Sequence, residues 1–313
     1  MIRAAWLTSA VYAAALCAGT ASAENLRLMT GPQGGSWYPM GGAIKNVVEG
    51  VVPDTTLQVM PGAGIANVKA IDAGKADIAF ANSVSTVDAI NGKPPFDEAA
   101  TNVCHLATLY PQYFQIVTTA DTGIESVDQL KGRGITTQPA GNTGEAITAH
   151  LLEAVGLSYD DLSGADFVSY NDSVALLKDG NSEVFTLGTT VPASAIMDLA
   201  SAREIRLLPV DDELLAKMQE LNPGYQPTEV PAGSYPGQDE AVPSIGYATH
   251  LIARCDLPDE TVFGVLEQIV DNQQDLASVA KAIGDTTLEQ MGADIGVPFH
   301  AAAEQFFKDK GVM

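Results

Sequence analysis

The first third of the chain alternates between two spacings of apolar residues. Runs of neighbouring apolar residues fit buried strands, and apolar side chains three or four positions apart fit one face of a helix. The elements predicted in this way are a strand at 25–30, a helix at 40–51, a strand at 57–59, a helix at 65–71 and a strand at 77–80. This region is therefore predicted to be a β-α-β-α-β unit.

The same order of elements returns later in the chain. It comprises a strand at 134–137, a helix at 147–155, a strand at 167–168, a helix at 174–177 and a strand at 183–187. The glycines that end the second helix of each unit, Gly74 and Gly180, occupy matching places. Strands that alternate with helices build parallel sheets covered on both faces. The expected fold class is α/β, with one lobe for each unit.

Two further β-rich runs, at 113–119 and 245–254, lie outside these units. The first precedes the second unit and the other follows it, so we expect a pair of antiparallel crossover strands that join the lobes. The resulting segments are 24–117 and 245–313 for lobe one and 118–244 for lobe two. The Pro- and Gly-rich segment 222–243 is expected to be irregular and exposed near the lobe interface.

The charge balance argues against two classes of partner. The 313 residues include 16 Lys+Arg and 39 Asp+Glu, which gives a formal net charge of −23 at pH 7. Nucleic acids and anionic lipid surfaces both bind cationic proteins, because binding neutralises phosphates. Neither is expected as a partner here, and the acidic excess is interpreted as a solubilising surface.

The N-terminus has the pattern of an export signal. Arg3 supplies a positive charge, residues 4–16 are apolar and Ala-rich, and Ala21-Ser22-Ala23 matches a cleavage site. A membrane-spanning helix is the alternative, but this stretch is only mildly hydrophobic and no later segment is long enough to cross a bilayer. The bulky Leu16 before Cys17 argues against lipidation. We expect a signal peptide at 1–23 and a periplasmic protein without membrane insertion.

Export also affects the interpretation of the two remaining cysteines, Cys104 and Cys255. An oxidising compartment permits a disulfide. Cys104 precedes the first crossover strand and Cys255 follows the second, and antiparallel pairing would bring those ends together. The topology thus predicts a Cys104–Cys255 disulfide. Two buried free thiols are the alternative.

The sequence lacks the common catalytic and metal-binding motifs. It contains no G-x-S-x-G, H-E-x-x-H, G-x-x-x-x-G-K-[ST] or G-x-G-x-x-G pattern. The histidines are scattered without metal-site spacing, at His105, His150, His250 and His300. No cofactor, metal or enzymatic activity is expected.

Each unit has a Gly-containing turn between its first strand and its first helix. Unpaired N–H groups at a helix N-terminus attract a carboxylate or a phosphate. Gly34 and Gly35 permit close backbone approach, Ser36 adds a hydroxyl, and Asn142 and Thr143 offer an amide and a hydroxyl in lobe two. Ordinary tight turns are the alternative for either loop alone. Two such loops on facing lobes favour a ligand site in a cleft.

Six segments occur in an order that is characteristic of a known family. They are Gly34-Gly-Ser-Trp-Tyr-Pro39, Ala73-Gly-Lys-Ala-Asp-Ile-Ala-Phe80, Leu109-Tyr-Pro111, Pro139-Ala-Gly-Asn-Thr-Gly-Glu145, Ile205-Arg-Leu-Leu-Pro209 and Val230-Pro-Ala-Gly-Ser-Tyr-Pro-Gly237. Together they resemble the TAXI family of substrate-binding proteins, which serve TRAP transporters. The resemblance implies a two-lobed, type II periplasmic-binding-protein fold. It also implies a monomer that delivers a small carboxylate, such as glutamate, glutamine or 2-oxoglutarate, to TRAP membrane subunits driven by an ion gradient.

The resemblance also implies a set of ligand-binding residues. Carried over segment by segment, they are Gly35, Ser36, Trp37, Tyr38, Asn82, Ser83, Asn142, Thr143, Gly144 and Gly188. Ser36 and Trp37 are variants of the family's pattern, and Gln112 stands where a Glu is common. Four arginines, at positions 133, 203, 206 and 254, lie outside these loops. We therefore expect hydroxyls, amides and helix N-termini to hold the ligand's anionic group without an arginine clamp.

Two other classes of function remain open, because a fold does not determine function. One is a secreted enzyme on a similar two-lobed scaffold, such as a hydrolase or a prephenate-type dehydratase. The missing nucleophile–base arrangement and the order of motifs along the chain favour binding over catalysis. The other is a sensor or adhesin, which would require an additional signalling segment that we do not find.

Overall fold

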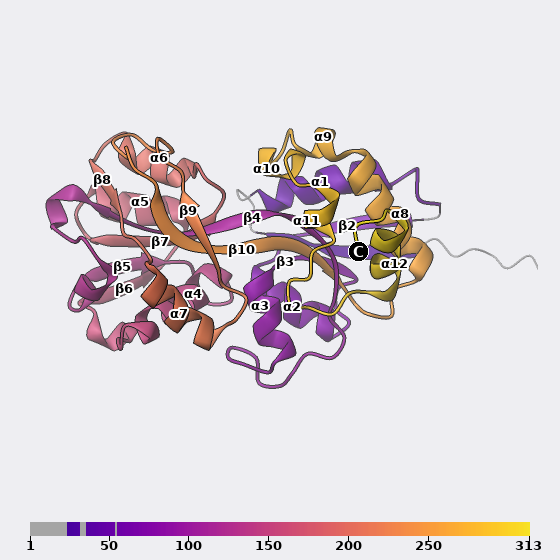
Figure 1. The fold of residues 1–313 in the computed structure, drawn as a ribbon, viewed down its shortest axis with the longest axis horizontal. Coiled ribbons are helices and arrows are strands. Elements are labelled where there is room, and N and C mark those ends of the chain that lie inside the picture. Colours follow the sequence, from indigo (N-terminus) through magenta and orange to yellow (C-terminus); the bar gives the residue numbers. More distant parts are fainter. Residues whose placement is uncertain (1–23, 32–35, 54) are drawn as a thin grey trace, which may run out of the picture.

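A computed structural model describes residues 24–31, 36–53 and 55–313. The predicted signal peptide at 1–23, with Cys17, and the predicted site residue Gly35 lie outside the described residues. Figure 1 shows an elongated molecule with two halves, and two long strands run from one half into the other. These strands are β4 (Cys104–Thr119) and β10 (Val242–Ala253).

The two long strands form the centre of one ten-stranded sheet. Its order is β2-β1-β3-β10-β4-β7-β5-β6, with β8 paired to β4 and β9 paired to β10. β10 pairs antiparallel with β4 from Ile245 opposite Phe114 to Ala253 opposite Cys104. The predicted antiparallel crossover strands are therefore confirmed, and the first begins nine residues earlier than the apolar pattern indicated. The predicted lobe boundaries fall inside these two strands.

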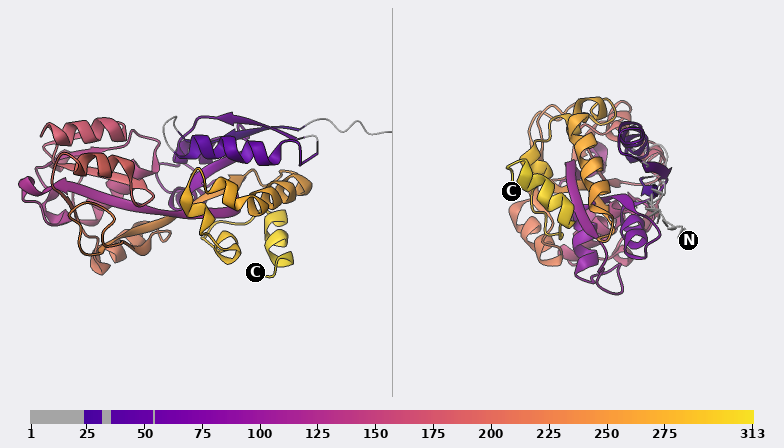
Figure 2. Two further views of the ribbon diagram at one scale, coloured as in Figure 1. Left: turned by 90° about the horizontal axis from the view of Figure 1, so that it is seen from above. Right: turned by 90° about the vertical axis from the view of Figure 1, so that its right-hand side faces the viewer.

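The first half contains the first predicted unit in the expected order. Its elements are β1 (Glu24–Met29), α1 (Trp37–Val48), β2 (Thr55–Met60), α2 (Gly64–Asp72), β3 (Ile78–Asn82) and α3 (Ser83–Ile90). β1 pairs in parallel with both β2 and β3. The C-terminal helices return to this half, as the yellow ribbon in Figures 1 and 2 shows. They are α8 (Asp259–Asp271), α9 (Gln273–Leu276), α10 (Lys281–Gly284), α11 (Leu288–Met291) and α12 (Ala301–Asp309).

The second half contains the second predicted unit and further elements. They are β5 (Gly134–Thr137), α4 (Thr143–Ala154), β6 (Gly164–Phe167), α5 (Tyr170–Lys178), β7 (Val184–Thr189), α6 (Ser194–Ala200), β8 (Ile205–Leu207), α7 (Asp212–Leu221) and β9 (Gln226–Val230). Short 3₁₀ turns lie at Ala120–Thr122, Val127–Leu130 and Tyr159–Asp161. The fold class is thus the expected α/β, with parallel strands flanking an antiparallel centre.

Two sequence predictions for this half were wrong. The strand expected at 167–168 is β6, which begins three residues earlier. The apolar pattern did not mark its start, because β6 is an edge strand with exposed residues such as Phe167. The segment 222–243, expected to be irregular, contains β9, which pairs antiparallel with β10. Pro227 lacks an N–H donor, but β9 lies at the edge of the β10 pairing, where a proline is tolerated.

The buried apolar residues divide largely between the two halves. One cluster joins α1, β1 and β2 to the C-terminal helices, through side chains such as Met40, Leu57 and Phe307. Another joins α4 and α7 to β4, through Leu151, Met218 and Phe114. Val84 of α3 packs into this second cluster, although α3 belongs to the first half. The contact keeps the two halves together at one side.

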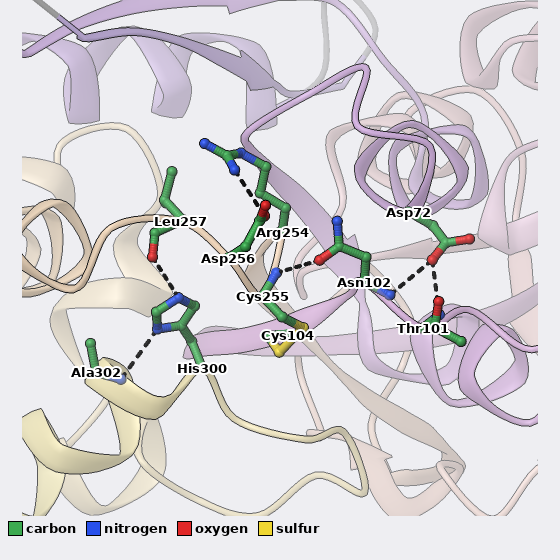
Figure 3. Close-up of a disulfide and its surroundings, with 10 residues drawn as sticks. All are labelled: Asp72, Thr101, Asn102, Cys104, Arg254, Cys255, Asp256, Leu257, His300 and Ala302. Atoms are coloured by element: carbon green, nitrogen blue, oxygen red, sulfur yellow. Dashed lines mark hydrogen bonds and ion pairs between the residues drawn. A yellow bond between two sulfur atoms is a disulfide. The ribbon is translucent and has the colours of Figure 1, made fainter. Parts of the chain in front are cut away.

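The Cys104–Cys255 disulfide that the topology predicted is present. It joins the first residue of β4 to a residue just beyond β10, with the Cα atoms 5.1 Å apart. Figure 3 shows the Cys255 backbone N–H donating to the Asn102 side chain, at 2.9 Å. The neighbouring Arg254 pairs with Asp77, whose pKa is lowered because hydrogen bonds from Arg27 and Arg254 outweigh its burial. The outer ends of the long strands are therefore held together covalently.

Candidate functional site

A cavity of about 550 Å³ lies between the two halves. The first half contributes Gly31, Ser36, Trp37, Ala63, Gly64, Asn82 and Gln112. The second half contributes four segments, which are Gln138 to Thr143 in part, Val168 to Asn171, Leu187 to Thr190 and Pro192 to Ala195. The cavity thus follows the ends of strands in both halves. We call it the cleft.

Five helices of eight residues or more begin at the cleft. The residues before or at their first turns that line it are Ser36 for α1, Ala63 for α2, Asn82 for α3, Asn142 for α4 and Ser169 for α5. This convergence follows from the β-α order, since each helix starts where a parallel strand ends, and the strands of the two halves run in opposite directions with their ends at the cleft. The first N–H groups of a helix have no partner within the helix and carry partial positive charge. The cleft therefore suits an anionic group.

The lining contains no Asp, Glu, Lys, Arg or His among the described residues. Residues 32–35, which lie outside the described residues, have the sequence Pro-Gln-Gly-Gly, without a charged residue. Tyr170 is the titratable lining residue; its hydroxyl donates to the Gly188 carbonyl at 2.9 Å, and burial raises its pKa above the usual range. An anion in the cleft would be neutralised by main-chain amides, hydroxyls and carboxamides rather than by a cationic side chain.

The structure brings six of the predicted site residues to the cleft. They are Ser36, Trp37, Asn82, Asn142, Thr143 and Gly188, and Gln112 lies with them. Three others do not line it. Ser83 instead accepts a hydrogen bond from the Ala248 N–H at 3.0 Å. Gly144 is buried against Gln138, whose Oε1 would lie 2.4 Å from a Cβ at position 144. Tyr38 lies one position beyond Trp37 in α1.

Sequence reasoning missed the part of the lining around α5 and α6. Ser169 is the N-cap of α5 and accepts a hydrogen bond from the Asp172 N–H, so this Ser-x-x-Asp spacing was a usable signal. The start of β6, the strand before α5, was predicted three residues too late, so the loop between β6 and α5 was not recognised as part of the site. The α6 side, Pro192 to Ala195, had no motif that marked it.

Aromatic side chains shape two walls of the cleft. Trp37 stacks on Phe80 with ring centroids 5.7 Å apart, and Tyr170 contacts Phe185 edge to face. Gly188 allows the Tyr247 side chain of β10 to approach closely, because a Cβ at position 188 would lie 1.8 Å from the Tyr247 hydroxyl oxygen. Residue 188 is therefore restricted to glycine unless Tyr247 moves.

Three neighbouring strands supply a polar floor on the first half's side of the cleft. Asn82 lies opposite Thr249 in the β3–β10 pair, and Thr249 lies opposite Tyr110 in the β10–β4 pair. Gln112 Nε2 donates to Thr249 Oγ1 at 2.6 Å. Burial raises the pKa of Tyr110 to about 12, so its hydroxyl stays protonated. We call Asn82, Tyr110, Gln112 and Thr249 the polar floor; Asn82 and Gln112 line the cleft, and Tyr110 and Thr249 are fully buried and do not line it.

One side of the cleft is closed by direct contacts between the halves. Ser85 Oγ and Thr143 Oγ1 share a hydrogen bond of 2.8 Å, and Asn222 Nδ2 donates to the Val84 carbonyl at 2.8 Å. Lys93 Nζ donates to the Leu221 carbonyl at 2.6 Å. Asp88 is buried beside this contact, and burial raises its pKa to about 6. These bonds connect α3 and the loop after it to the start of α4 and to the end of α7.

No group of three or more His, Cys, Asp or Glu side chains among the described residues is arranged to hold a metal ion. None of the helices in the same residues combines the length and apolar character needed to cross a bilayer.

The fold resembles several solved structures that hold small molecules or are named for transport. PhnD1 from Prochlorococcus marinus, solved with methylphosphonate, is 12% identical with a TM-score of 0.53, over 92% of this chain and 99% of that one. An ancestral arginine-binding protein bound to arginine is 12% identical with a TM-score of 0.50, over 82% and 96%. A putative L-cystine ABC transporter protein from Listeria monocytogenes is 13% identical with a TM-score of 0.50, over 83% and 96%.

At these identities the likeness concerns the fold alone, which is α/β. A family model provides the closer assignment. The model of the NMT1-like family matches residues 28–311, which is nearly all of the described chain. The chain belongs to the NMT1-like family.

Proposed function

We propose that this protein is an extracytoplasmic solute-binding protein that captures a small carboxylate in the cleft. The observation that carries the proposal is the uncharged polar cleft onto which helix N-termini from both halves converge. Helix N-termini bind carboxylates without a cationic side chain. Binding rather than catalysis is further supported by the structural neighbours, two of which hold methylphosphonate or arginine.

Capture requires that the halves move relative to each other. In this proposal lobe one is 24–117 with 245–313, lobe two is 118–244, and β4 and β10 are the connecting strands. A ligand that contacts both lobes stabilises the closed arrangement and raises the melting temperature by mass action. The Ser85–Thr143 bond would be one of the contacts that closure forms or tightens.

The predicted membrane partner is a TRAP-type permease driven by an ion gradient. Its support is the order of TAXI-like segments, above all Val230 to Gly237, which begins at the last residue of β9 and ends before β10. Uptake into proteoliposomes that hold the TRAP membrane subunits tests this. Uptake driven by a sodium gradient supports a TRAP system, and uptake that requires ATP and ABC subunits contradicts it.

Export is the remaining element of the proposal. Its support is the export-signal pattern of residues 1–23, which lie outside the described residues, and β1 begins at Glu24, directly after the predicted cleavage site. Intact mass measurement of protein from the periplasmic fraction is expected to give a chain that begins at Glu24. An uncleaved chain in the cytoplasmic fraction would contradict export.

A ligand screen tests the proposed function directly. Thermal shift and calorimetry with amino acids, monocarboxylates and dicarboxylates are expected to identify at least one carboxylate that raises the melting temperature. Thr143→Val, which removes a buried cleft hydroxyl at the start of α4, should weaken that binding about tenfold. Ser182→Ala removes a buried hydroxyl of the same half that does not line the cleft, and serves as the control.

Two results would count against the proposal. Melting shifts with sugars or metal ions alone would exclude a carboxylate receptor. A ligand-bound structure with an arginine guanidinium paired to the ligand carboxylate would contradict recognition by amides and hydroxyls.

A further inference from the structure

The polar floor contains two carboxamide oxygens without hydrogen-bond partners. Asn82 Oδ1 and Gln112 Oε1 are both buried, and their residues are 8% and 6% exposed. Both residues line the cleft. Gln112 is oriented by its own donor, since Nε2 bonds to Thr249 Oγ1. Oε1, on the other side of the Gln112 amide, has no hydrogen-bond partner.

A buried carbonyl oxygen without a donor costs about 1–3 kcal/mol, and native proteins rarely leave one unpaired. Two such oxygens, on the strands β3 and β4 that flank β10, indicate that a donor reaches this end of the cleft when a ligand binds. A carboxylate or phosphonate oxygen placed there would instead face two carbonyl oxygens. It would find no cationic side chain among the described lining residues.

The position of Asn82 also restricts the charge of the donor. Asn82 is the N-cap of α3, and its side chain makes no capping bond. The field at a helix N-terminus disfavours positive charge, so an ammonium group is a poor match beside Asn82. An uncharged N–H or O–H group satisfies the oxygens without opposing that field.

We propose that the cleft selects a small carboxylate whose far end is an uncharged hydrogen-bond donor, a carboxamide or a hydroxyl, over one that ends in a second carboxylate. Asn82 and Gln112 recognise the donor, and helix N-termini elsewhere in the cleft hold the carboxylate. This inference rests on the proposed function and narrows its ligand class. It disfavours dicarboxylates such as 2-oxoglutarate.

Matched ligand pairs that differ at one end test the inference. L-glutamine is compared with L-glutamate, glutaramate with glutarate, and 4-hydroxybutyrate with succinate, by calorimetry at pH 7. The donor member of at least one pair is expected to bind ten times more tightly than its diacid partner. Equal or tighter binding of the diacid in every pair that binds would overturn the inference and leave carboxylate binding intact.

Two nearly isosteric variants identify the residues responsible. Gln112→Met and Asn82→Leu remove the oxygens, and each is expected to reduce the preference to about threefold or less. Gln115→Met is the matched control, because Gln115 is buried on the same strand but does not line the cleft. An unchanged preference in both cleft variants would overturn the assignment of these residues.

The wild-type comparison tests the selectivity even if a variant does not fold. Failure of all six ligands to bind would contradict the proposed carboxylate function together with this inference. Binding without preference for the donor would contradict the inference alone.

Discussion

The two β-α-β-α-β units have similar sequence patterns but differ in the burial of their second strands, β2 and β6. Thr55 and Leu57 of β2 are buried, whereas no residue of β6 is buried and three of its four residues are exposed. Both are end strands of the sheet, but Leu57 packs into the apolar cluster that joins α1 to the C-terminal helices. The helices that cover a strand, rather than its position within a repeated unit, therefore decide how far its side chains are buried.

The halves also differ in how they are anchored. The first half has the disulfide and the returning C-terminal helices, and its largest apolar cluster extends from Leu26 to Phe307. The edge of the second half, near β6, is held by surface contacts such as Lys131 with Asp161. Perturbations of the first half should therefore have larger effects on stability.

Removal of the disulfide should have the largest effect. Cys104 and Cys255 are 151 residues apart, and closing a loop of this size stabilises a protein by about 4–5 kcal/mol in the chain-entropy account. Cys104→Ser/Cys255→Ser should lower the free energy of unfolding by up to this amount, measured by urea denaturation. Reduced wild type is the control. Two free thiols in the unreduced mature protein would contradict the bond.

Acid should destabilise the first half through its buried histidine pair. His105 Nδ1 and His250 Nδ1 are 3.0 Å apart on β4 and β10, and burial lowers the pKa of His105 to about 3 and that of His250 well below its usual value. The unfolded chain therefore binds more protons than the folded chain between about pH 6.5 and 3, so stability is lost as pH falls through this range.

The expected loss between pH 7 and pH 4 is at least about 3 kcal/mol, the contribution of His105 alone, measured by urea denaturation at several pH values. His105→Leu/His250→Leu should show a flatter pH dependence, because it carries neither buried imidazole. His150→Asn, on α4 of the second half, is the comparison variant and should retain most of the dependence. Identical pH dependence in wild type and the double variant would disprove this explanation.

Asn222→Ala tests the contact that joins the halves. Asn222 is fully buried; its amide donates to Val84 and its Oδ1 accepts from the Gly224 N–H at 2.8 Å. Loss of both bonds should cost about 1–2 kcal/mol of unfolding free energy and increase the radius of gyration measured by X-ray scattering. Asn181→Ala, on the exposed turn after α5, is the control. A variant as stable and compact as wild type would rule out a role in holding the halves together.

Lys131→Ala should have the smallest effect. The Lys131 ammonium is 3.9 Å from the Asp161 carboxylate, and the lysine side chain is 72% exposed. Surface ion pairs of this kind contribute less than about 0.5 kcal/mol and are screened by salt. Thermal melts should therefore differ little from wild type. A loss comparable with that of Asn222→Ala would show that the edge of the second half is anchored more strongly than its contacts indicate.

The spacing of apolar residues was sufficient to predict the class of fold. The elements from β1 to β3 and from β5 to β7 occur in the predicted order, and β4 pairs with β10 as expected. These features depend on which side chains of each strand or helix are buried. The spacing of apolar residues indicates those side chains for one element at a time. The boundaries of β6 and the existence of β9 were missed, because edge strands carry exposed or proline-containing sequences.

The sequence by itself determined the two α/β units, the crossover strands between them and the proximity of Cys104 to Cys255. Only the tertiary structure decided which polar residues share the floor of the cleft. Gln112 and Thr249 are 137 residues apart and meet because β10 lies beside β4, while Asn82 joins them from β3 on the other side of β10. Periodicity describes one element at a time, and a binding site depends on the order in which strands from distant parts of the chain assemble.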